Sequence, residues 1–203
     1  MKSSYRDAVD EIQRALRDIL KPQGFRAKGR VFNRTTDDGL TQVIGIQMGA
    51  SDPPGTTYFP GLRENLHGLF TINLGVYVPE VAVHHSASPA KSWVHDSHCC
   101  VRSRLGALCV ENADLWWPAV VDSAGLEDVA TRLQVAGIPF LDRFASRDRI
   151  LTEWEGQSEN WGASSPPRIV CAIILATRNQ PEKARRLLTH KLAKRRIQAT
   201  QHT

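Results

Sequence analysis

Long apolar runs are missing from this chain of 203 residues. No segment approaches the roughly 20 consecutive apolar residues that a membrane-spanning helix needs. The N-terminal segment is charged and amphipathic, whereas a signal peptide has an apolar centre. The sequence therefore predicts a cytoplasmic protein with no membrane partner.

Cysteine is scarce, and its spacing matches no known framework. The four cysteines are Cys99, Cys100, Cys109 and Cys171, with one adjacent pair and no C-x-x-C. Neither a disulfide scaffold nor a zinc ribbon is indicated. We expect reduced thiols, some of them in the core, and no cofactor.

The His/Cys-rich segment 84–100 invites two chemical readings. His95 and His98 precede Cys99 and Cys100, and these residue types bind zinc, but a closed site needs four convergent ligands. A cysteine nucleophile beside His98 is also disfavoured, because neighbours in a strand point to opposite faces. No catalytic residue is predicted, and metal binding by this segment is left open.

Motifs of the common enzyme classes are also missing. The chain has no G-x-S-x-G, no P-loop, no G-x-G-x-x-G and no H-E-x-x-H. An enzyme is therefore not the favoured prediction, although a small-ligand or enzymatic pocket stays as an alternative.

Positive charge is concentrated at one end of the chain. The net charge is +5, but residues 182–203 contain seven Lys or Arg and one acidic residue, so the rest is close to neutral. Such a basic helix can bind nucleic-acid phosphates, which is a less favoured alternative to a protein partner.

The most regular pattern lies at residues 69–78. Apolar residues alternate there with polar or small ones, which is typical of a strand with one buried face. Similar but weaker patterns predict strands at 25–34, 41–48 and 100–108. An amphipathic helix is predicted at the N-terminus, up to Leu20.

Helical patterns dominate the second half of the chain. Apolar spacing predicts helices from Ser123 to near Gly137 and from Ser146 onward, then an antiparallel hairpin after Pro166 that ends in the basic helix. The fold class predicted is α+β: an N-terminal helix packed on an antiparallel sheet of about four or five strands, followed by C-terminal helices. A Gly- and Ser-rich linker divides this domain (1–155) from a helical appendage (156–203).

The sheet face opposite the core is the predicted binding site. Alternation places several guanidinium groups, an amide and a phenol on it, which together can bind carboxylates or phosphates. The candidate residues are Arg26, Arg30, Arg34, Asn73, Tyr77, Arg102 and Arg104. Two alternatives stay open: an ordinary solvated face, or a face covered by the C-terminal helices.

Several short motifs carry a family resemblance. They are Gly24-Phe25, Phe32-x-Arg34, the run from Phe70 to Tyr77, Cys100-x-Arg-x-Arg-Leu-Gly106, and Trp116-Trp117. In this order they resemble a bacterial domain-of-unknown-function family (DUF4304-like), over about residues 5–140. Members of such families often sit beside secreted toxins as immunity proteins, which is an analogy of type from which no activity of this chain follows.

The function predicted is that of a small bacterial protein-binding protein, an immunity or inhibitor protein that neutralises a cognate toxin by direct binding. Besides the sheet face, the long connection at residues 49–68 is a candidate contact, because long loops in compact domains are often functional.

Overall fold

The computed structural model describes most of the chain. The described residues are 2–50, 52–53, 55–59, 62, 64–86, 91–120, 122–154 and 167–188. Within these ranges, no helix combines the length and the apolar character needed to cross a bilayer.

The predicted α+β class is confirmed, although the helix at Pro79–Ser86 was not predicted and the strand expected at 100–108 ends at Arg104. The helices and strands are α1 (Lys2–Leu20), β1 (Arg26–Lys28), β2 (Val31–Thr35), β3 (Thr41–Met48), β4 (Leu69–Tyr77), α2 (Pro79–Ser86), η1 (Asp96–His98), β5 (Val101–Arg104), η2 (Gly106–Leu108), β6 (Trp117–Pro118), α3 (Ser123–Arg132), η3 (Leu133–Gly137), α4 (Ile138–Arg143), α5 (Arg147–Trp154) and α6 (Pro167–Thr177). A further helical stretch covers residues 181–188.

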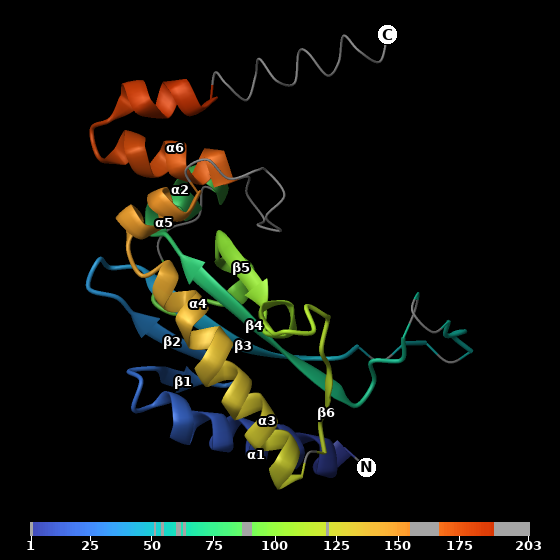
Figure 1. Cartoon of the computed structure of the whole chain (residues 1–203). Coiled ribbons are helices and arrows are strands. Elements are labelled where there is room, and N and C mark those ends of the chain that lie inside the picture. Colours follow the sequence, from blue (N-terminus) through green and yellow to red (C-terminus); the bar gives the residue numbers. More distant parts are fainter. Residues whose placement is uncertain are drawn as a thin grey trace, which may run out of the picture.

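One antiparallel sheet forms the centre of the molecule (Figure 1). Its strand order is β1-β2-β3-β4-β5, and β6 pairs with the beginning of β4 on the same side as β5. The prediction of β4 is confirmed: Phe70, Ile72 and Leu74 are fully buried on one face. The prediction that only one face of this strand is buried is wrong, because Thr71 and Asn73 on the other face are buried too.

The segment predicted as one strand at 25–34 is a hairpin instead. Lys28 pairs with Val31 across a two-residue turn, and Gly29 in that turn has a φ of +56°. Such turns need positive φ, which glycine adopts without strain. Because the turn changes the alternation, β2 does not continue the face pattern of β1.

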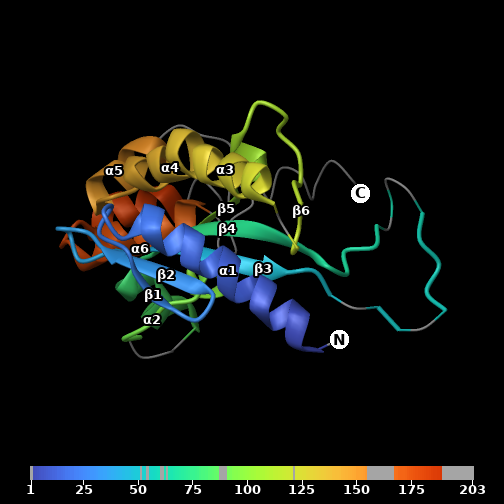
Figure 2. The same ribbon diagram turned by 90° about the horizontal axis from the view of Figure 1, so that it is seen from below.

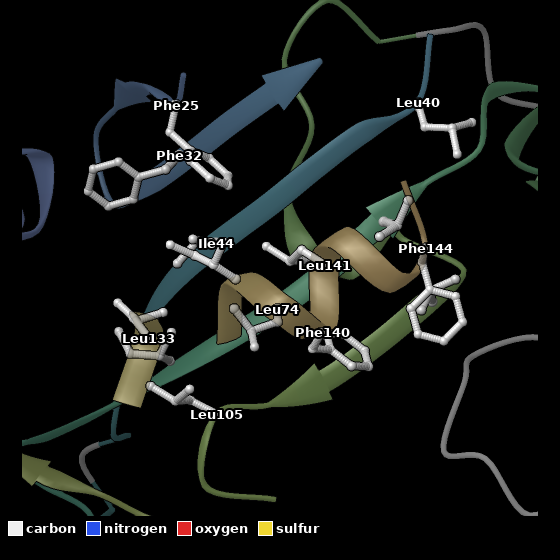
Figure 3. Close-up of a cluster of buried hydrophobic side chains, with 14 of the residues drawn as sticks. Phe25, Phe32, Leu40, Ile44, Leu74, Leu105, Leu133, Phe140, Leu141 and Phe144 are labelled. Carbon is white, nitrogen blue, oxygen red and sulfur yellow. The ribbon is translucent and has the colours of Figure 1, made fainter. Parts of the chain in front are cut away.

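The helices α1, α3 and α4 cover one face of the sheet (Figures 1 and 2), and the main hydrophobic core lies between them. Figure 3 shows how Ile44 and Leu74 of the sheet meet Leu133 and Leu141 of the helices. We call this covered side the core face. The opposite side is the outer face.

Gly137 does not end a helix, contrary to the prediction. α3 passes through η3, one turn of π-helix, directly into α4. A Cβ at Gly137 would lie 3.2 Å from Leu105 Cδ1 and 3.5 Å from Leu74 Cδ1. The glycine therefore lets the helix approach the sheet closely.

The C-terminal hairpin is present and packs on the end of the sheet domain. Ala172 and Leu175 of α6 contact Ala184 in the stretch 181–188, and Asn179 turns the chain with a φ of +57°. α6 packs on α2 and α5, and its Ile174 belongs to the main core. The proposed linker and residues 189–203 lie outside the described residues, and the domain division at 155 stays a prediction.

Candidate functional site

A short segment covers one half of the outer face. Val94 and Cys99, on either side of η1, pack against Val31, Val43 and Tyr77 of the sheet. Tyr77 is only 2% exposed, so the expectation of an accessible phenol is wrong. The cover comes from residues 94–99, and no residue of the described part of the C-terminal helices belongs to this cluster.

Two glycines let this cover lie close to the sheet. A Cβ at Gly75 would come within 2.6 Å of Cys99 Cβ, and one at Gly45 within 3.1 Å of Asp96 Oδ1. Glycine inside a strand often marks the close approach of another backbone. The sequence thus carried a signal for the covered half that the alternation of side chains did not.

The two adjacent cysteines are not activated. Burial raises the pKa of Cys99 well above its usual value and that of Cys100 to about 12. Both thiols are therefore protonated at neutral pH, which disfavours a nucleophilic role. Among the described residues, no three His, Cys, Asp or Glu side chains gather in a way that could hold a metal ion.

His98 makes the cover sensitive to pH. Its Nδ1 accepts a hydrogen bond from the backbone N–H of His95 at 3.2 Å, which requires a neutral ring. Desolvation lowers the pKa of His98; Lys91 and His95 lower it further, and Asp96 opposes them. The unfolded chain therefore takes up this proton at higher pH than the folded chain, so stability falls as pH drops below about 6.5.

We expect the protection factor of His95 N–H, which is the exchange rate of an unfolded amide at the same pH divided by its own exchange rate, to fall from pH 7.5 to pH 5.5, and the urea midpoint to fall with it. His98→Asn keeps an acceptor that does not titrate, so its pH dependence should be smaller. Amide exchange by NMR and urea titrations measure both effects. An unchanged pH dependence in the variant would contradict this role of His98.

Arg34 lies on the core face, contrary to the prediction. It follows Phe32 in the alternation of β2, and its guanidinium bonds Asp142 of α4 and Gln42 of β3. It also lies 4.6 Å above the ring of Phe25. The hairpin turn before β2 moved this side chain to the opposite face, where it links helix and sheet.

Arg26 and Arg30 are separated from the other predicted site residues. Arg26 is in β1 and Arg30 follows in the hairpin turn, whereas Arg102 and Arg104 are in β5 at the other edge. Four strand spacings, about 19 Å, separate the two edges. The covered half lies between them, so the seven candidates do not form one site.

The remaining candidates gather at one end of the outer face. Asn73 lies opposite Arg104 in the sheet, and its Nδ2 donates to Gln47 Oε1 at 2.8 Å. Arg104 pairs with Asp114 and stacks 5.3 Å from the Trp116 ring. We call Gln47, Asn73, Arg102 and Arg104 the polar end. Its guanidinium groups are about one-third exposed.

The connection between β3 and β4 begins beside the polar end and projects away from the body (Figures 1 and 2). It carries two large apolar side chains in water: Phe59 is 54% exposed and Leu62 is 85% exposed. Tyr58 beside them is also exposed. Clustered exposed apolar groups on a protruding loop are typical of interaction sites.

The basic helix is described only in its first half. Lys183, Arg185 and Arg186 are exposed there, and Arg185 bonds Glu182. The other predicted basic residues, Lys191, Lys194, Arg195 and Arg196, lie outside the described residues. Nothing in the described part favours nucleic acid over solvent.

No family model, curated protein or solved structure matches this chain. The resemblance to the DUF4304-like family stays a prediction.

Proposed function

We propose that this chain is a cytoplasmic protein-binding protein that inhibits a toxin by covering it with the projecting loop and the polar end. The supporting observation is the exposure of Phe59 and Leu62 at a loop that extends beyond the sheet. Apolar and aromatic side chains at such positions are what interfaces bury. The neighbouring guanidinium groups add hydrogen-bond donors that suit a carboxylate-bearing protein surface.

The loop residues are tested by site-specific crosslinking in the native cell. A photoreactive residue at Leu62 should capture one dominant protein, whereas the same residue at Val135, which is 69% exposed on the helical side, should not. Expression of the captured protein alone should stop growth, and co-expression of this chain should restore it. This outcome would support both binding and inhibition.

Truncation of the loop side chains tests how much they contribute to the affinity for the captured protein. Phe59→Ala combined with Leu62→Ala should weaken binding of the captured protein about 10- to 100-fold, the loss expected for two interface side chains. Val110→Ala, at a fully exposed position elsewhere, is the matched control and should change nothing. Equal capture from Leu62 and Val135 would refute the loop as the contact, and a captured protein that is harmless alone would refute inhibition.

A further inference from the structure

β5 is an edge strand of the sheet in the described part of the chain. It pairs with β4 on one side and has no described strand on the other. An unpaired edge is a template for a further strand, and proteins bind extended segments in this way. The residues at this edge indicate which kind of extended segment it would bind.

The hydrogen-bond register shows which backbone groups of β5 point away from β4; of these, the Arg104 carbonyl accepts from Ser103 Oγ at 3.2 Å. Leu105 N–H donates to Ile72 O at 2.9 Å, so residues 101, 103 and 105 point their backbone groups toward β4. On the β3 side of β4, Gly49 N–H donates to Leu69 O. The odd-numbered residues of β4 therefore bond to β3, and its even-numbered residues bond to β5. The N–H groups of Arg102 and Arg104 therefore point to the open edge.

The same two residues place their side chains on the outer face at that edge. Arg102 pairs with Asp96 at 3.5 Å, and Arg104 pairs with Asp114 and stacks on Trp116; each side chain is about one-third exposed and has five N–H donors. An added strand would have two of its side chains directly opposite these arginines.

This charge pattern distinguishes between two kinds of occupant. Antiparallel pairing of β5 with a second copy would set Arg102 against Arg104 of the copy, and like charges in that position destabilise a pair. Carboxylates two residues apart would instead form forked bonds to both guanidinium groups. We infer that the free edge of β5 binds an extended segment of the partner protein that carries acidic residues at alternate positions.

The inference rests on the proposed function, because it specifies which part of the protein partner the polar end recognises. β5 spans four residues, so the added strand contributes few backbone hydrogen bonds. Phe59 and Leu62 of the projecting loop would supply the apolar contacts of the same interface.

A synthetic peptide tests the edge directly. The probe is an eight-residue peptide of alternating Glu and Val, blocked at both ends, added to the full chain. At about 90% occupancy, amide exchange of Arg102 and Arg104 should slow about tenfold, since only the free fraction exchanges. The amides of Val101 and Ser103, already bonded to β4, should change little.

Two methylated peptides separate strand addition from simple charge attraction. In the expected register the Glu nitrogens face β5 and the Val nitrogens face away. Methylation of the Glu nitrogens should abolish binding, and methylation of the Val nitrogens should not. Equal binding of both peptides, or no binding of the parent peptide at millimolar concentration, would overturn the inference.

Charge reversal supplies the specificity test. The double variant Arg102→Glu with Arg104→Glu should no longer bind the Glu-Val peptide and should instead bind the corresponding Lys-Val peptide. Arg14→Glu with Arg17→Glu changes the net charge equally on the exposed side of α1 and should leave peptide binding unchanged. If the β5 variant still prefers the Glu-Val peptide, the edge of β5 is not the peptide-binding site.

The two proposals fail separately. If the protein captured through Leu62 is neutralised while Arg102 and Arg104 exchange freely in the complex, the edge inference is wrong and the proposed function stands. If the peptide binds as described but the captured protein is harmless, the inhibitor function is wrong and the edge remains a binding site.

Discussion

Replacing Arg147 by alanine is expected to lower the free energy of unfolding by about 3 kcal/mol, the loss typical of removing one partner from a largely buried ion pair. Arg147 begins α5 and binds two other parts of the chain. Its Nε and Nη2 donate to the two oxygens of Glu80, at 2.6 and 2.8 Å. Its backbone N–H donates to Asp38 Oδ2 at 2.7 Å.

This contact connects α5 to α2 and to the turn between β2 and β3. Glu80 is only 15% exposed and Arg147 19%, so without the guanidinium a carboxylate would stay largely out of water with no partner. Arg147→Lys keeps the charge but loses the fork, and should cost about 1–2 kcal/mol. Urea unfolding followed by tryptophan fluorescence measures both variants.

The matched control is Arg143→Ala, which removes a more exposed pair with Glu153. Such surface pairs contribute about 0–1 kcal/mol. If the Arg147 and Arg143 variants lose equal stability, the contact of Arg147 with Glu80 and Asp38 contributes no more than an exposed ion pair.

Replacing Gly75 by valine is expected to cost about 3 kcal/mol and to detach the cover from the outer face. The new Cβ would overlap the Cβ and Sγ of Cys99, and neither the strand nor the buried thiol has room to move. Overpacking of this kind typically costs 1–3 kcal/mol. Amide exchange should increase in residues 94–99 more than in β4.

A double-mutant cycle separates the clash from other effects. Gly75→Ala should be destabilising alone, and less so when Cys99→Gly removes the opposing Cβ, with a coupling of about 1 kcal/mol or more. Additive effects of the two changes would mean that the cover does not press on Gly75.

The local elements of this fold were largely predictable. The period-2 pattern of β4 and the helical spacing of α1 depend on nearest neighbours in sequence, and both were correct. The same alternation placed Asn73, Arg102 and Arg104 together on the outer face, as the strand pairing confirms. The alternation predicted the wrong face for Arg34. The turn at Gly29 reverses which side chains face the core, and the regular spacing of basic residues along the sequence does not reveal that turn.

Other features depend on contacts between distant residues. Tyr77 is buried because a segment about 20 residues later returns to cover it, and Arg147 meets Asp38 across 109 positions. The alternation of side chains does not encode such contacts, although Gly45 and Gly75 mark where the cover approaches the sheet.

By itself the sequence determined the N-terminal helix and the strand β4, and it placed Asn73, Arg102 and Arg104 on one face, because these features follow from local geometry. Only the tertiary structure decided that half of the outer face is covered, that Arg26 and Arg104 lie at opposite edges, and that β5 pairs on one side only among the described strands. Strand order and coverage are set by packing across the whole chain, and two strands with the same alternation can lie at the centre of a sheet or at its border.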